Sequence, residues 1–137
     1  MLKGIAFFLS IVLFVFCFYA LYAERSPVFR GYATEYELYL KAGSFGEGTV
    51  YATDKDYYEY LNVKGESCFV NASYEQLLRD FNATHIFIET TAAGESRYAY
   101  SPRIRYKIYI GGRAVNIHYF TCESYAKVGT PIIYGGF

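Results

Sequence analysis

The hydrophobic pattern divides the chain at residue 23. Residues 4–23 (GIAFFLSIVLFVFCFYALYA) contain no charged side chain and begin directly after Lys3. About 20 helical residues, at roughly 1.5 Å rise each, cover about 30 Å, the thickness of the hydrocarbon core of a bilayer. The segment therefore predicts a transmembrane helix, a signal anchor in residues 1–23, followed by a separate domain in residues 24–137.

A cleaved secretory signal peptide is the alternative interpretation of this apolar segment. The apolar regions of signal peptides are usually about 7–15 residues long, shorter than the segment in this chain. In addition, Leu21 occupies a position at which the small-x-small cleavage pattern requires a small side chain. Both observations favour an uncleaved anchor over cleavage after Ala23, which would release a secreted, disulfide-stabilised domain such as an inhibitor or effector.

The charges that flank the apolar segment bear on its orientation. Lys3 precedes the segment, whereas Arg25 and Arg30 follow it, so the basic residues on its two sides nearly balance. A short segment before a single hydrophobic span is usually retained in the cytoplasm. We therefore expect a single-pass protein with a cytoplasmic N-terminus and with residues 24–137 outside the cytoplasm.

Short runs of alternating apolar and polar residues follow the apolar segment, the pattern of half-buried strands. Strands are predicted at residues 36–40, 49–51, 57–63, 68–70, 85–89, 97–100 and 132–134. The runs 57–63 and 68–70 are expected to pair as a hairpin across Lys64-Gly65-Glu66. Pro102 is expected to end the strand at 97–100, because proline cannot donate to a strand ladder.

One helix is predicted from the cap residue Ser73 to Asn82. Leu77 and Phe81 share one face of this helix, and a glutamine stands at the capping-box position three residues after Ser73. The sequences Asn-Ala-Ser at Asn71 and Asn-Ala-Thr at Asn82 flank the helix. These are glycosylation acceptors if the source is a eukaryote with a secretory pathway, and the helix ends should expose them.

The clearest turn signal is Gly111-Gly112, which supplies the positive φ angles of a type I′ hairpin turn. Such a turn fixes the register, so that one apolar face holds the pairs Ile110–Arg113, Ile108–Val115, Tyr106–Ile117 and Ile104–Tyr119. The opposite, outward face is expected to hold Arg103, Arg105, Lys107, Tyr109, Ala114, Asn116, His118 and Phe120. In sum, the sequence predicts an α+β fold: a mainly antiparallel sheet with one packed helix.

Composition narrows the function classes. The chain has 137 residues with 13 basic and 13 acidic side chains, and 53% of it is hydrophobic. These values exclude a multidomain enzyme, a disordered tail and a strongly basic nucleic-acid binder. Charge is nevertheless uneven, because residues 24–95 hold 12 acidic and 6 basic side chains, whereas residues 96–137 hold one acidic and 6 basic side chains.

This asymmetry indicates a binding surface on the expected outer face of the hairpin. The candidate binding residues are Arg103, Arg105, Lys107, Tyr109, Asn116 and His118. A cationic row of this kind would attract an anionic polymer, lipid headgroups or an acidic protein, and no nucleic acid is expected. The 17 tyrosines could add contact area. The alternatives are a solvated face and ordinary strand-forming tyrosines.

The chemistry that the sequence lacks argues for binding rather than catalysis. His85 and His118 stand in no zinc motif, and no phosphate-binding loop is present, so no metal and no cofactor is predicted. The acidic turn at residues 54–59 departs from an EF-hand loop. A small hydrolase, using Cys122 with His118 and a carboxylate, is a third hypothesis, but the sequence predicts no enzyme.

Two cysteines remain outside the apolar segment, Cys68 and Cys122. In an oxidising compartment they could form one disulfide, which would close a long loop. The alternative is two free thiols, because cysteine is among the most often buried residue types. The sequence leaves both interpretations open.

Overall fold

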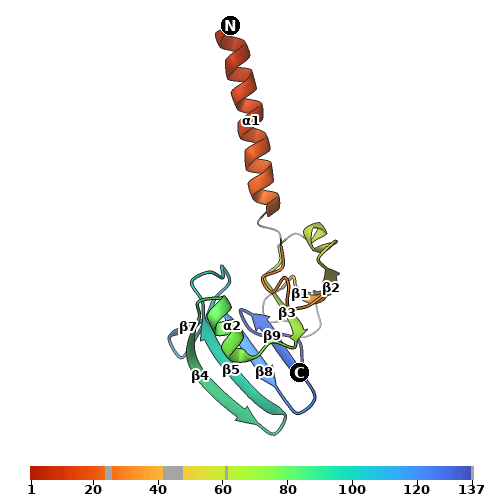
Figure 1. Cartoon of the computed structure of the whole chain (residues 1–137), viewed down its shortest axis with the longest axis vertical. Coiled ribbons are helices and arrows are strands. Elements are labelled where there is room, and N and C mark those ends of the chain that lie inside the picture. Colours follow the sequence, from red (N-terminus) through yellow and green to blue (C-terminus); the bar gives the residue numbers. More distant parts are fainter. Residues whose placement is uncertain (24–25, 42–47, 61, 137) are drawn as a thin grey trace.

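The structure is a computed structural model that describes residues 1–23, 26–41, 48–60 and 62–136 (Figure 1). The chain begins with a long helix and continues into a region of short strands with one further helix. The elements in order are α1 (Leu2–Ala23), β1 (Glu35–Tyr39), β2 (Thr49–Thr53), the 3-10 helix η1 (Tyr57–Glu59), β3 (Gly65–Val70), α2 (Tyr74–Asp80), β4 (Thr84–Thr91), β5 (Gly94–Tyr100), β6 (Ile108–Ile110), β7 (Arg113–Val115), β8 (Ile117–Thr121) and β9 (Ala126–Thr130).

Seven strands form one antiparallel sheet in the order β2-β1-β3-β9-β8-β5-β4, and β6 and β7 form a separate two-stranded hairpin. Helix α2 covers one face of the large sheet (Figure 1). The predicted α+β class is therefore confirmed. Strand β9 lies in the centre, where it joins β3 to β8.

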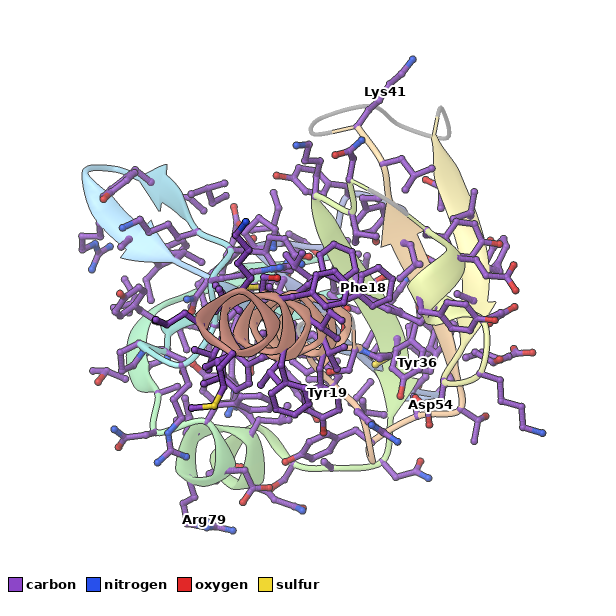
Figure 2. The ribbon with its side chains drawn as sticks, turned by 90° about the horizontal axis from the view of Figure 1, so that it is seen from above. Phe18, Tyr19, Tyr36, Lys41, Asp54 and Arg79 are labelled. Atoms are coloured by element: carbon purple, nitrogen blue, oxygen red, sulfur yellow. The ribbon has the colours of Figure 1, made fainter. Side chains whose placement is uncertain are left out.

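Helix α1 stands apart from the sheet. Its apolar stretch Leu2–Leu21 is long and apolar enough to cross a membrane, and none of this stretch is buried against the rest of the chain. Viewed along the helix, Phe18 and Tyr19 point outward from its axis (Figure 2). Phe18 is 65% exposed. The helix therefore presents apolar side chains on all sides, as a membrane-spanning helix does.

The main core lies between the sheet and α2. Leu77 of α2, Leu38 of β1 and Val128 of β9 are each 0% exposed. Helix α2 begins where predicted, because the Ser73 hydroxyl accepts a hydrogen bond from the backbone N–H of Gln76 at 3.2 Å. Its apolar side packs onto alternate side chains of the strands, and this packing stabilises the sheet region.

The opposite face of the sheet is covered by residues 131–136, defined here as the tail. The backbone N–H of Ile133 donates to His118 Nδ1 at 3.2 Å, and that of Gly135 donates to the Tyr39 hydroxyl at 3.2 Å. Lys127 Nζ donates to the carbonyl of Gly136 at 3.3 Å. Both faces of the central strands are therefore buried, one by a helix and one by an extended segment.

The predicted Gly111-Gly112 hairpin is confirmed at its tip and wrong beyond it. Both glycines have positive φ, 57° and 77°, and Ile110–Arg113 and Ile108–Val115 pair as expected. The pairs Tyr106–Ile117 and Ile104–Tyr119 do not form, because β8 pairs with β5 and β9 instead.

The side chain of Asn116 explains why the hairpin stops. Its amide oxygen accepts from the N–H of Ser101 at 2.7 Å, and its amide nitrogen donates to the carbonyls of Ser101 and Ile104 at 2.7 and 3.1 Å. These hydrogen bonds satisfy backbone groups of the turn at residues 101–104. If the hairpin strands continued, this turn could not form.

Three further predictions of strands are wrong. Residues 57–59 form η1, residues 60, 62 and 63 belong to no strand, and residue 61 lies outside the described residues. The expected hairpin is also wrong, because β3 pairs with β1 and β9. Residues 132–134 form part of the tail and no strand. The strand at this end of the chain is β9, whose sequence Ala-Lys-Val-Gly-Thr shows little alternation.

Candidate functional site

The basic residues Arg103, Arg105 and Lys107 lie together on the segment that leaves the sheet after β5. We call residues 103–107 the basic segment. All three basic side chains are exposed, as predicted, whereas Ile104 between them is buried and fixes the segment to the core. The basic segment is irregular backbone rather than a strand, so its charges follow a turn and do not form a straight row.

A groove runs beside the basic segment. We call it the stalk groove, because its other wall is formed by residues 26–28, the short stalk that comes after α1 in the sequence. Its volume is about 390 Å³, and it is lined by Ser26, Pro27, Val28, Asp80, Phe81, Arg103, Ile104 and Arg105. The groove therefore joins three parts of the chain: the residues after α1, the end of α2 and the basic segment. Polar and apolar side chains both contribute to its walls.

Hydrogen bonds fix Arg103 and Asp80 at the rim of the stalk groove. Arg103 Nη1 donates to the backbone carbonyl of Asp80 at 3.0 Å. The Asp80 carboxylate accepts a short hydrogen bond from the Tyr32 hydroxyl. Burial and the Asp80 carboxylate raise the pKa of Tyr32 to about 12. Two arginines and one carboxylate therefore line the groove, which leaves it with an excess of positive charge.

Arg105 contacts its neighbour Tyr106 and acts on a buried carboxyl group. Its Nη2 donates to the Tyr106 hydroxyl at 2.8 Å, and its guanidinium lies 4.8 Å from the centre of the Tyr106 ring. Its charge also acts on the buried carboxyl of Glu66, which accepts from the Phe29 N–H at 3.0 Å and the Tyr57 hydroxyl at 2.9 Å. Burial raises the pKa of Glu66 to about 7, and the hydrogen bonds and Arg105 act in the opposite direction.

Lys107 and Tyr109 extend the charged surface toward the hairpin. Lys107 Nζ lies 5.9 Å from the centre of the Tyr109 ring, a cation–π contact. The Tyr109 side chain is 66% exposed. Four of the six predicted binding residues are therefore on the surface: Arg103, Arg105, Lys107 and Tyr109.

The expected exposure is wrong for the other two predicted binding residues, Asn116 and His118. Asn116 is 0% exposed and holds the turn after β5, whereas His118 is 3% exposed. His118 Nδ1 accepts from the Ile133 N–H, so Nε2 carries the proton and donates to the Ser96 hydroxyl at 3.0 Å. Burial lowers the pKa of His118 to about 4. His118 is buried because the tail covers this face of the sheet. The alternating sequence pattern alone assigns the same face to solvent.

The geometry separates the residues of the hydrolase hypothesis. Cys122 directly follows β8 and lies four residues after His118, a distance of about 13 Å along an extended chain. Cys122 Sγ lies 3.8 Å from the carbonyl of Tyr125, while both ring nitrogens of His118 have other partners. The structure does not place this thiol and this imidazole within hydrogen-bond reach of one another.

The two cysteines of the disulfide hypothesis are free thiols, Cys68 buried and Cys122 half-buried. The register places Cys68 beside Val128 and Val128 beside Tyr119, so that Cys122 lies three residues beyond this row. Three residues of strand cover about 10 Å, more than a disulfide spans. Burial raises the pKa of Cys68 above its ordinary value, which makes this thiol unreactive.

A buried polar network on the tail side of the sheet was not predicted. Lys127 Nζ forms an ion pair with Glu37 Oε2 at 2.9 Å. The Ser67 hydroxyl donates to the same carboxylate at 3.1 Å and lies 2.6 Å from the Tyr39 hydroxyl, which accepts from Gly135. The network joins β1, β3, β9 and the tail. A lysine between the small apolar residues of β9 was the only sequence signal for it.

The remaining candidate residues are placed as follows. Asn71 and Asn82 are exposed at the two ends of α2, as predicted for glycosylation acceptors.

In the acidic turn, Asp56 accepts from the hydroxyl of Thr53 at 2.8 Å, and hydrogen bonds from Thr53 lower the pKa of this carboxyl. Within the described residues, no group of three or more histidine, cysteine or acidic side chains could hold a metal ion.

The burial of several tyrosines favours the interpretation that the high tyrosine content mainly reflects ordinary strand-forming residues. Tyr36, Tyr39 and Tyr57 are each at most 3% exposed and belong to buried packing. Tyr36 lies beside Asp54 (Figure 2), and burial together with that carboxylate raises its pKa. Only a minority of the tyrosines, including Tyr109, offer a large exposed ring.

Comparisons of the chain with protein-family models, curated proteins and solved structures found no match. Its function is therefore inferred from α1, the basic segment and the stalk groove. The groove joins the basic segment to residues 26–28, which follow α1 closely in the sequence.

Proposed function

We propose that the chain is a single-pass membrane-anchored protein whose sheet region lies outside the cytoplasm and binds an anionic partner. The observation that carries this proposal is the exposure of α1. Its apolar stretch has no side chains buried against the sheet region, while that region closes its own core around Leu77 and Val128. An apolar helix that the rest of the chain leaves uncovered is most stable in a membrane.

Binding rather than catalysis is the proposed activity of the sheet region. Its exposed charges gather on the basic segment, whereas the titratable groups Glu66 and His118 are buried and already hydrogen-bonded. Three exposed basic side chains in five residues attract anionic groups over about a Debye length. The partner is an anionic polymer, a lipid headgroup or an acidic protein.

Fractionation and mass measurement test the anchor. We expect the intact mass of the full-length chain in the membrane fraction of its own cells. Protease added to intact cells or spheroplasts should remove the sheet region, because it faces outward. A protein in the medium whose mass begins at Glu24 would support the alternative, a secreted domain. A sheet region that resists protease until the membrane is opened would overturn the orientation.

Charge reversal tests the binding surface. The variants Arg103→Glu and Lys107→Glu change two exposed side chains and spare Arg105, which acts on the buried Glu66. We expect the double variant to keep the fold, as measured by circular dichroism, and to lose at least about tenfold in recovery of anionic partners. Unchanged recovery would remove the basic segment as the binding surface.

A further inference from the structure

The position of the stalk groove narrows the anionic partner to one class. We propose that the groove and the basic segment bind the headgroups of anionic phospholipids in the membrane that α1 crosses. This inference rests on the proposed anchoring by α1. The ligand would be the phosphate of a headgroup, held between the wall formed by Ser26–Val28 and the guanidinium of Arg103.

Chain connectivity keeps the groove close to the membrane surface. The apolar stretch of α1 ends at Leu21, and Ala23 lies two residues farther, about 3 Å along the helix. Ser26 lies at most about 11 Å from Ala23, because three consecutive Cα steps cannot reach farther. Ser26 itself lines the groove. One wall of the groove is therefore within about 14 Å of the hydrocarbon edge, whichever path the chain takes.

This distance matches the reach of charged lipids. The headgroup layer is about 5–8 Å thick on each side of a bilayer, and electrostatic attraction extends about 8 Å farther at physiological ionic strength. The two lengths together reach the wall of the groove that Ser26 forms. The membrane is also permanently beside the groove in an anchored chain, so that a weak surface binds headgroups at a high effective concentration.

The chemistry of Arg103 suits a phosphate. A guanidinium has five N–H donors in a planar fork that matches phosphate oxygens. Arg103 directs one donor to the carbonyl of Asp80, and it has no carboxylate partner within the described part of the chain. The Asp80 carboxylate, which also lines the groove, accepts from Tyr32. Arg105 and Lys107 add positive charge on the same segment.

A single tryptophan can report this contact, because the chain contains none. The probe is Tyr109→Trp in the full-length chain, a substitution at an exposed ring beside Lys107. The protein is placed in nanodiscs that carry a quencher on a fixed fraction of lipid headgroups. We expect stronger quenching in discs with phosphatidylglycerol than in phosphatidylcholine discs. The difference should vanish near 1 M salt, where the Debye length is about 3 Å.

Arg103→Glu and Arg113→Glu form a matched pair of variants. Each changes one exposed arginine whose guanidinium donates to a backbone carbonyl, Asp80 at 3.0 Å for Arg103 and Ile86 at 3.1 Å for Arg113. Arg113 lies on β7 and does not line the groove. We expect Arg103→Glu to lower the ratio of docked to undocked protein in anionic discs by at least about fivefold. Arg113→Glu should leave the ratio nearly unchanged.

Each result has a defined meaning. If Arg103→Glu fails to fold, Lys107→Glu replaces it, because Lys107 contacts only an exposed ring in the described structure. Equal quenching in both kinds of disc, or equal loss in both arginine variants, overturns the lipid site. That result leaves the anchor intact, and recovery of an acidic protein by the same surface would then assign the segment to a protein partner. A chain that does not enter nanodiscs instead contradicts the proposed anchoring.

Discussion

The two faces of the large sheet are closed by different means. On the α2 side, Leu77 and its neighbours fill the space with apolar side chains, and Glu66 is an acidic side chain fully buried there. On the tail side, a short segment is held by hydrogen bonds to Tyr39, Lys127 and His118. The apolar stripe of α2 packs on its face of the sheet without directional bonds, whereas the tail adds these hydrogen bonds to the apolar packing of Ile133 and Tyr134.

The two faces therefore contribute differently to the amount of stability and to the choice of strand register. Apolar contacts on the α2 side contribute in proportion to the area that they bury, and similar side chains can replace one another. Each polar group on the tail side requires its own partner, so the ion pair of Lys127 with Glu37 fixes the position of β9 against β1. The α2 side should therefore carry more of the stability, and the tail side more of the register.

The largest expected effect is on the α2 side. Leu77→Ala removes a side chain that is 0% exposed, and we expect the free energy of unfolding to fall by about 4 kcal/mol. The comparison variant is Phe69→Ala on the tail side, where the ring is 58% exposed and contacts Tyr125. We expect a loss below about 1 kcal/mol for Phe69→Ala. Urea unfolding of the full chain in micelles measures both, and equal losses would contradict the comparison.

The next effect is on pH dependence, where the two faces act in opposite directions. The pKa of Glu66 rises from 4.5 to about 7 in the folded protein, so its contribution to stability is lost as pH rises through this range. The pKa of His118 falls from 6.5 to about 4, so its contribution is lost as pH falls through that range. Each amounts to about 3 kcal/mol, and the two nearly cancel in the native chain.

Single variants should reveal the two opposed dependences of stability on pH. We expect Glu66→Gln to gain stability as pH rises from about 4 to 6.5, because the shifted pKa of His118 is then no longer offset by that of Glu66. His118→Asn should lose stability as pH rises from about 4.5 to 7. Unfolding midpoints measured across this range give the slopes, independently of how much each substitution destabilises at one pH. Flat profiles in both variants would show that folding shifts neither pKa.

The smallest effect concerns the ion pair on the tail side. Lys127→Met leaves Glu37 without its cation, and we expect a loss of about 2 kcal/mol, since the Glu37 side chain is 18% exposed and keeps some hydration. Adding Glu37→Gln should restore part of the loss. A double-mutant cycle by urea unfolding measures the coupling between the two side chains. A coupling energy of zero would mean that the pair does not fix β9.

Much of the fold could be predicted from local signals. The cap at Ser73, the turn at Gly111-Gly112 and the alternation of most strands act over a few residues, and the structure contains them. Strand β9 could not be predicted, because it is buried on both faces and its pattern contains a lysine whose partner is Glu37. The pairing of distant partners is not visible in a local pattern.

The candidate site was predictable only in part, for a related reason. Long charged side chains such as Arg103 and Lys107 tend to be exposed in most backbone conformations. Their exposure was therefore predicted correctly, although the longer hairpin expected for this segment does not form. His118 was misplaced because alternation assigns a residue to a face without saying what covers that face. The stalk groove was missed because Ser26 and Arg103 are far apart in sequence and meet only in the folded chain.

The central position of β9 has a consequence for how the chain assembles. β2, β1 and β3 form one half of the sheet and β8, β5 and β4 the other, and among the described strands β9 alone pairs with both halves. Since β9 follows all the other strands in the sequence, the two halves stay unbridged during synthesis until residues 126–130 emerge. Contacts between distant segments form slowly. The nascent sheet region therefore carries open strand edges until β9 pairs with β3 and β8.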